Sequence, residues 1–143
     1  MILLGQDQAA WRFSRGYVEN VAAAIALAVS DDRATNRTYN VADRVVHSQA
    51  EWVQSIGRAA GWNGALRIVP EDQLPDHLRA QEYLRQDWVV DTTRIRTELS
   101  YEDRVSLDEG LRRTVAWERA NPPANIREAE YEYEAEDRFL AEM

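Results

Sequence analysis

The longest apolar run in the chain, Val21 to Val29, is nine residues long, and five of them are alanine. Apolar residues on every side predict a helix that packs against neighbours on more than one face, with Asn20 capping its start. The run is far below the ~20 apolar residues that cross a bilayer. The first seven residues carry no basic side chain and turn polar after four, unlike a signal peptide. We therefore expect a globular chain with no membrane partner and a cytoplasmic location.

The rest of the chain alternates short apolar segments with helix-start signals. Two capping boxes, Ser48 to Glu51 and Ser106 to Glu109, each predict the start of a helix. Two further helices are predicted to follow Pro75, as far as about Leu84, and Asp91. Alternating or short apolar runs predict strands at 11–18, 38–41, 66–69 and 88–90. These strands are too few and too short for a complete sheet. The expected fold class is α/β or α+β, with at least five helices packed on a few short strands.

Composition excludes several classes of protein. The 143 residues suit about one domain. With 17 basic and 25 acidic residues the net charge is −8, which argues against a nucleic-acid partner. The absence of cysteine excludes disulfides and thiolate zinc sites. His47 and His77 share no cluster with other ligand-type residues, so no metal site is expected.

No lysine occurs anywhere in the chain, so all 17 basic residues are arginine. A Schiff base, a P-loop lysine and a Tyr-x-x-x-Lys oxidoreductase pair are therefore excluded within it. The spaced glycines Gly57, Gly61 and Gly64 look like a dinucleotide fingerprint, but they close a predicted helix and precede a strand. A phosphate-binding loop needs the reverse order, so we interpret them as a helix C-cap. No catalytic and no cofactor-binding residue is predicted.

Arginines in or just before predicted strands are the main indication of a binding site. Arg12 and Arg15 lie in the first predicted strand, and Arg85 lies three residues before the last. Arginine presents a planar set of donors that binds phosphate or carboxylate bidentately. Several of them at neighbouring strand ends would form an anion-binding pocket. The alternative is ordinary surface ion pairing with the surplus of acidic residues.

Five segments, in this order, resemble the C-terminal portion of the NAD-dependent epimerase/dehydratase family of extended short-chain dehydrogenases/reductases. The first, residues 12–25, resembles the family's Arg-x-[Phe/Tyr]-x-[His/Tyr]-Val-x-Asp-Val-Ala-x-Ala-Ile pattern. The second segment, 38–41, resembles the family's Tyr-Asn-[Val/Leu] strand, and the third is the helix after Ser48. The fourth, 91–101, resembles its Asp-x-Ser-[Lys/Arg] helix and the Leu-Gly-[Tyr/Trp] that ends it, and the fifth is 106–117. Ala42 and Ser100 stand where the family usually has glycine, and Asn20 where it usually has aspartate.

The resemblance implies a substrate-side domain without the family's Rossmann core. The substrate it implies is a sugar nucleotide or a similar phosphorylated, polar molecule. NAD or NADP is implied for a full-length relative, and no cofactor for this chain, which lacks the cofactor loop and the Tyr-x-x-x-Lys pair. The substrate-binding residues that it implies are Arg12 or Arg15 for phosphate, Arg85 as a second arginine, and Tyr17 and Asn20 beside the pocket.

We divide the chain into a substrate-binding-like domain, 1–121, and an acidic amphipathic tail, 122–143. The Val21–Val29 helix and the edge of the 39–41 strand would be uncovered without a cofactor domain, so we expect a homo-oligomer. Three functions stay open. The chain is a truncated epimerase or dehydratase that is inactive alone, a non-catalytic interaction module, or half of a site completed by a separate Rossmann-domain partner.

Overall fold

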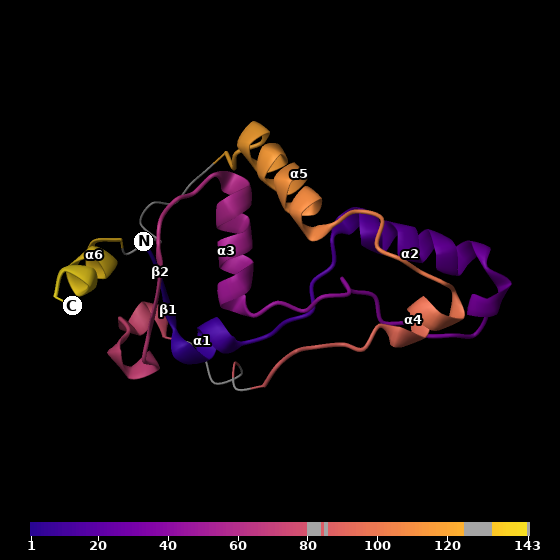
Figure 1. Cartoon of the computed structure of the whole chain (residues 1–143), viewed down its shortest axis with the longest axis horizontal. Coiled ribbons are helices and arrows are strands. Elements are labelled where there is room, and N and C mark those ends of the chain that lie inside the picture. Colours follow the sequence, from indigo (N-terminus) through magenta and orange to yellow (C-terminus); the bar gives the residue numbers. More distant parts are fainter. Residues whose placement is uncertain (80–83, 85, 125–132, 143) are drawn as a thin grey trace.

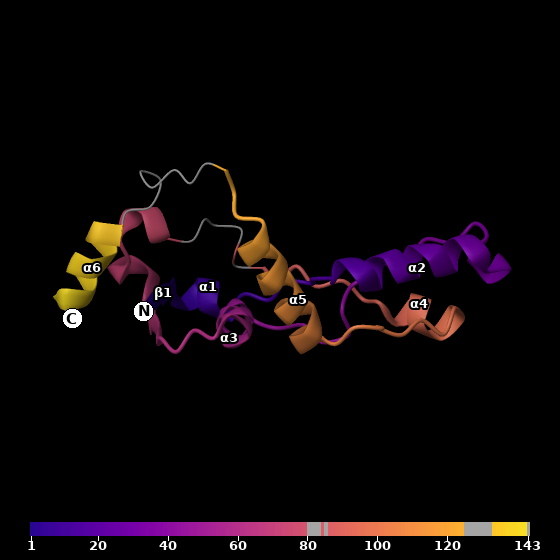
Figure 2. The ribbon, with the colours of Figure 1, turned by 90° about the horizontal axis from the view of Figure 1, so that it is seen from above.

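The computed structural model describes residues 1–79, 84, 86–124 and 133–142. The molecule is elongated, with α2 and α4 side by side at one end and both chain termini at the other (Figure 1 and Figure 2). We call the end with α2, α4 and residues 35–42 the arm. We call the part with β1, α1, α3 and β2 the body.

Helices dominate the described residues, as expected for the fold class. The α-helices are α1 (Gln6–Ala10), α2 (Val18–Ser30), α3 (Gln49–Ala60), α4 (Thr93–Glu98), α5 (Leu107–Ala120) and α6 (Tyr133–Ala141). Short 3₁₀ turns lie at Asp32–Ala34, Glu71–Gln73 and Asp76–Leu78. The strands β1 (Ile2–Gly5) and β2 (Leu66–Val69) pair in parallel, with Ile2 opposite Leu66 and Gly5 opposite Val69.

Of the four predicted strands, only the one at 66–69 is confirmed, as β2. Between the segments 11–18 and 88–90, the strand pairing is limited to an isolated parallel bridge between Phe13 and Trp88. Trp88 N donates to the Arg12 carbonyl and the Trp88 carbonyl accepts from Ser14 N, both at 2.9 Å. The backbone pairing does not continue, because Val90 N donates to the Ser14 hydroxyl instead of a carbonyl. Residues 38–41, predicted as a strand, form no regular secondary structure. The four-residue β1 lies in a segment where no strand was predicted.

Helix starts follow the local signals where the side chain is free to cap. Ser48 and Glu51 form a complete capping box, and Gly61 ends α3 at a left-handed φ of 69°. At α5 one hydrogen bond of the capping box is present, because the Ser106 hydroxyl accepts from Glu109 N. The Glu109 carboxylate binds Arg112 and Arg113 instead of the Ser106 N–H.

Two of the predicted helix starts differ from the structure. The prediction that Asn20 caps α2 is wrong: Tyr17 holds that place, and Asn20 lies inside the helix with its side chain turned to the segment before α5. The helix predicted after Pro75 is a single 3₁₀ turn, Asp76–Leu78, and part of its predicted length lies outside the described residues.

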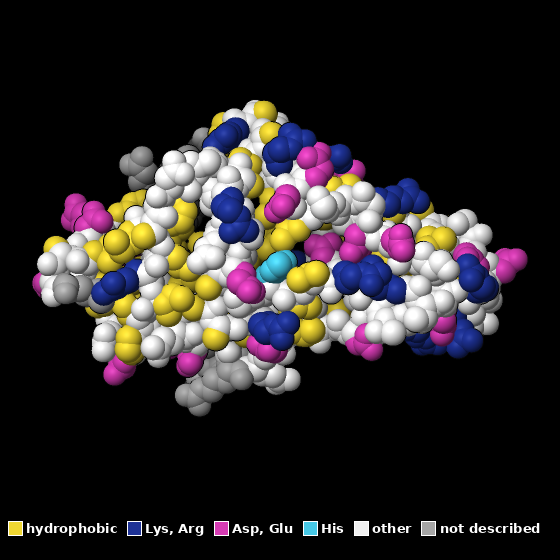
Figure 3. Space-filling model, in the orientation of Figure 1, with side chains coloured by type: hydrophobic (Ala, Val, Ile, Leu, Met, Phe, Trp, Pro, Cys, Tyr) yellow, Lys and Arg dark blue, Asp and Glu magenta, His cyan; other side chains and the backbone are white. Residues whose placement is uncertain are grey.

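The apolar side chains form two small cores. In the arm, Ala24, Ile95, Leu99 and Tyr101 are buried together, with partly buried side chains of α2 packed against them. In the body the buried residues are Leu3, Val69 and Leu74, and the partly buried residues that pack on them are Leu78, Phe139 and Leu140. The tail helix α6 thus covers the body core. In the space-filling view, hydrophobic side chains gather over the β1–β2 end, whereas basic and acidic side chains intermingle along the arm (Figure 3).

Two further features complete the fold. Ser100, just after α4, has a φ of 56° in the left-handed region, which suits glycine better than serine. In the described residues, no helix combines the length and apolar character that a membrane crossing requires.

Candidate functional site

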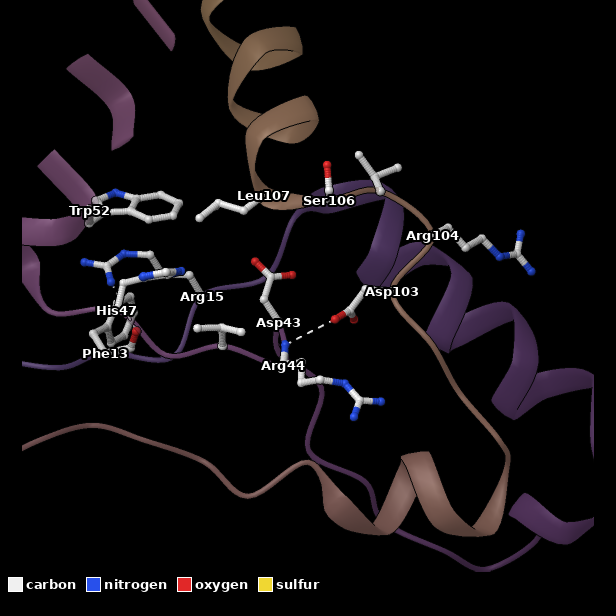
Figure 4. Close-up of a pocket in the computed structure, with 12 residues that line it drawn as sticks. Phe13, Arg15, Asp43, Arg44, His47, Trp52, Asp103, Arg104, Ser106 and Leu107 are labelled. Atoms are coloured by element: carbon white, nitrogen blue, oxygen red, sulfur yellow. Dashed lines mark hydrogen bonds between the residues drawn. The ribbon is translucent and has the colours of Figure 1, made fainter. Parts of the chain in front are cut away.

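A cavity of about 350 Å³ lies where the arm meets the body. Its walls come from four separate stretches: residues 13–15, residues 43–47, Trp52 on α3 and residues 103–107 before and at the start of α5 (Figure 4). We call this space the charged cavity, because Arg15, Asp43 and His47 are among the residues that line it.

Arg15 is one of the cations that line the charged cavity. Its guanidinium carbon lies 4.5 Å from the centre of the Trp52 ring and 5.1 Å from that of Phe13, so the group is stacked between two aromatic faces. Nη2 donates to Gln49 Oε1 at 2.6 Å and Nη1 to the Phe13 carbonyl at 3.2 Å. These two bonds leave further N–H donors of the five that arginine carries.

No neighbour that the structure describes neutralises the charge of Arg15. Among the residues that the structure describes, no carboxylate forms an ion pair with it. Partial burial lowers the pKa of Arg15 from its ordinary value, but a guanidinium remains protonated at neutral pH. A stacked, half-buried cation with neutral hydrogen-bond partners is a site that favours an anion.

Asn20 holds one wall of the charged cavity from behind. It is 2% exposed; its Oδ1 accepts from Arg104 N at 2.9 Å and Val105 N at 3.0 Å, and its Nδ2 donates to the Val105 carbonyl at 2.9 Å. The Tyr101 hydroxyl donates to the Asn20 carbonyl at 3.0 Å. Burial, with Asp103 nearby, raises the pKa of Tyr101 to about 12, so this hydroxyl keeps its proton.

Asp103 joins the two loops that form the arm side of the cavity. Its Oδ2 accepts from Arg44 N at 3.1 Å, and its Oδ1 pairs with Arg96 Nη2 at 3.0 Å. The same Arg96 nitrogen donates to the Ala42 carbonyl at 2.9 Å. Residues 42–44 and 103–105 are therefore fixed to each other through one buried guanidinium. The Arg44 and Arg104 side chains extend away from Arg15 (Figure 4).

The residues that the sequence singles out fall in different places. Arg15 lines the charged cavity, Tyr17 lines an adjoining apolar groove, and Asn20 lies behind the wall. Arg12 is exposed, and its Nη2 donates to the Val46 carbonyl at 3.3 Å outside the cavity. Arg85 lies outside the described residues. Their contacts with a substrate remain predictions.

Sequence reasoning missed several residues of the cavity. Asp43 accepts from Tyr17 N at 3.3 Å, and His47 Nδ1 lies 3.9 Å from Glu51 Oε2. Trp52 lies in the helix predicted to follow Ser48, but no role in a site was predicted for it. The one local signal was that His47 immediately precedes the Ser48 capping box, which fixes it at the start of a helix.

The apolar groove that Tyr17 lines has a volume of about 660 Å³ and runs between α3 and α5. Ile56 on α3 and Leu111 and Val115 on α5 face it. It shares four residues with the charged cavity: Phe13, Arg15, Trp52 and Leu107.

No family model and no curated protein matches the chain, but solved structures do. Three of them are a UDP-glucose 4-epimerase from Thermotoga maritima with UDP-glucose, a dTDP-glucose 4,6-dehydratase from Bacillus anthracis with NAD, and the enzyme WbmF from Bordetella bronchiseptica with NAD⁺. The TM-scores are 0.60, 0.57 and 0.58, and the sequence identities are 21%, 19% and 25%. The chain has the fold of part of these enzymes.

The match covers most of this chain but little of its neighbours. It takes in 85%, 83% and 80% of the chain, and 36%, 34% and 31% of the three enzymes in the same order. The chain therefore spans about a third of their length. Two of these neighbours are named as an epimerase and a dehydratase, and two were solved with NAD or NAD⁺, in agreement with the resemblance of the five sequence segments.

Proposed function

We propose that the chain is the substrate-side, C-terminal lobe of an NAD-dependent epimerase or dehydratase. In this proposal the charged cavity binds the phosphate-bearing part of a sugar nucleotide or a similar phosphorylated, polar substrate. The observation that carries it is Arg15, stacked between Phe13 and Trp52 with N–H donors to spare and no described carboxylate paired to it.

The chemistry of the cavity matches a substrate of that class. The Arg15 guanidinium would take a phosphate through charge-assisted hydrogen bonds. Asp43, whose backbone N–H donates to the Arg15 carbonyl at 2.7 Å, also lines the cavity and would accept a hydrogen bond from a sugar hydroxyl (Figure 4). A ring N–H of His47 would add a donor to the phosphate. A volume of about 350 Å³ is at the lower end of small-molecule sites, so it suits one portion of a nucleotide sugar.

The proposed lobe binds and orients but does not itself transfer hydride. NAD would supply hydride transfer from a nucleotide-binding lobe outside this chain, because the chain contains neither a glycine-rich strand–helix turn nor lysine for a Tyr-x-x-x-Lys pair. Residues of the chain would hold the phosphate, fix the sugar and limit the access of water to the cavity.

A second candidate, half of a site completed by another chain, is favoured by the exposed face of α2. Ala23 and Ala24 are buried, but on the other side of the same helix Ile25 is 59% and Val29 83% exposed. Exposed apolar residues in a contiguous row mark a surface for a partner. A separately encoded nucleotide-binding lobe, or a second copy of this chain, would cover it.

Nuclear magnetic resonance of the indole N–H groups tests the binding proposal residue by residue. The chain has five tryptophans, and the Trp52 signal is assigned from its loss in Trp52→Phe. Titration with UDP should shift the Trp52 signal saturably and leave that of Trp117, on the exposed face of α5, unchanged. In Arg15→Gln the shift should disappear, and in the control Arg37→Gln, on the arm, it should persist. An unmoved Trp52 signal at millimolar UDP would refute the proposal.

A further inference from the structure

The apolar groove is too large and too open to be a packing defect. Its volume of about 660 Å³ lies within the range of small-molecule sites, and aliphatic side chains of α3 and α5 form its sides. Ile56 is 37% exposed, and Val115 is also partly exposed. Each such side chain keeps apolar surface in water that a bound apolar group would cover.

A close contact between α5 and Tyr17 forms one edge of the groove. Gly110 of α5 lies against the Tyr17 ring: a Cβ added there would be 3.0 Å from two ring atoms. Tyr17 is fixed in turn, since its hydroxyl donates to Glu19 and its N–H donates to Asp43. Tyr17 and α5 therefore form a continuous wall, and the groove is a built feature of the fold.

The groove continues into the charged cavity. Phe13, Arg15, Trp52 and Leu107 line both spaces, so the stacked Arg15–Trp52 pair stands at their boundary. A ligand with its anionic group on Arg15 that extends past Trp52 enters mainly apolar surroundings. UDP-glucose carries no hydrocarbon part that would use this space.

We propose that the site takes an amphiphilic ligand: an anionic, phosphate-type head at Arg15 and a hydrocarbon chain in the apolar groove. The position of the anionic head rests on the proposed function. The hydrocarbon part of the ligand extends that function to substrates or products that carry an alkyl or acyl group. An apolar side chain of a protein partner would fill the groove alone, whereas this ligand fills the groove and pairs with Arg15 at the same time.

Calorimetry with inorganic phosphate and with butyl, hexyl and octyl phosphate, each below its critical micelle concentration, tests the proposal. The phosphate head is the same in each ester, so differences in affinity within the series report the contribution of the alkyl group. Affinity should rise by about two- to fourfold per methylene, the range expected when each CH₂ is partly or fully buried. Arg15→Gln should lower the affinity of every member by a similar factor.

Variants that fill the groove separate it from the exposed apolar face of α2. Val115→Trp should abolish the dependence on chain length and leave inorganic phosphate binding unchanged. Ile56→Trp provides a second filling variant if the first unfolds. The matched control, Val29→Trp, adds the same side chain at an exposed site on α2 and should keep the full dependence.

The outcomes distinguish the two proposals. Phosphate binding that needs Arg15 but shows no dependence on chain length overturns the amphiphile and leaves the proposed function standing. Chain-length dependence that survives both filling variants places the hydrocarbon elsewhere and also overturns it. Absence of binding by every member of the series overturns both.

Discussion

The guanidinium of Arg15 lies 4.5 Å from the centre of the Trp52 ring, and this contact joins the segment after α1 to the first turn of α3. It fixes a cation at the boundary between a charged and an apolar space. The 2.6 Å bond from Arg15 to Gln49, also on α3, makes the same connection by a second route. The position of Arg15 is thus set by the start of one helix, which the Ser48 capping box specifies.

Arg15 and Arg12 should differ sharply in their effect on ligand binding. Arg15→Gln removes a charge-assisted contact of about 1.5–3 kcal/mol, which corresponds to roughly a 10- to 150-fold weaker affinity for UDP. Arg12→Gln should change the affinity less than about threefold, because Arg12 is exposed and bonded to Val46 outside the cavity. Calorimetry on both variants measures the two effects. Equal losses would mean that the phosphate binds near Arg12.

Asn20→Ala should destabilise the fold more than most polar substitutions. It removes the buried Asn20 side chain from the N–H groups of Arg104 and Val105 and from the Val105 carbonyl, at a cost of about 2–4 kcal/mol. Denaturant unfolding measures the change. The control, Asn63→Ala at an exposed position with no side-chain bond to a described residue, should cost less than about 0.5 kcal/mol. Similar values for the two would contradict the role assigned to Asn20.

The link between α2 and α5 should weaken in acid. Arg113 binds Glu109 at 2.6 Å and Glu19 at 2.9 Å, and Arg112 and Arg113 lower the pKa of Glu109 from 4.5 to about 2. A depressed carboxyl pKa stabilises the fold above the unfolded value and loses this contribution as pH falls through the folded one. The difference in Tm between the unaltered chain and Arg113→Gln should therefore shrink between pH ~4.5 and ~2. A difference that is constant over this range would show that the ion pairs do not contribute.

The exposed face of α2 should cause self-association that strengthens with salt. Ile25 and Val29 offer an apolar surface, while a net charge of −8 keeps copies apart at low ionic strength. Sedimentation at two salt concentrations measures this, with Ile25→Asp/Val29→Asp as the variant that should remain monomeric. If the unaltered chain stays a monomer at tens of micromolar in both salts, this surface has a different partner or none.

Local signals predicted the parts of the fold that depend on neighbours in sequence. The Ser48 capping box and the Gly61 C-cap needed only a few adjacent residues, and both are confirmed. Asn20 was mistaken for a cap because its hydrogen-bond partners lie 84 and 85 residues further along the chain. β1 was missed because four residues at a terminus give too short a pattern.

The candidate site was harder to predict than the fold. Its aromatic and cationic members, Phe13 and Arg15, lie close in sequence, and the family resemblance pointed to this segment. Other parts of its wall come from residues 43–47 and 103–107, about sixty residues apart, which are joined through Arg96 and Asp103. No spacing in the sequence indicates that Asp43 and His47 face the same cavity as Arg15.

Calorimetric titration of the chain with UDP-glucose and, separately, with NAD tests the proposed function most directly. We predict saturable binding of UDP-glucose that Arg15→Gln weakens at least tenfold, and no saturable binding of NAD at micromolar concentrations, because the chain lacks a dinucleotide-binding loop. Saturable micromolar binding of NAD together with no binding of UDP-glucose would contradict the assignment of this chain to the substrate side.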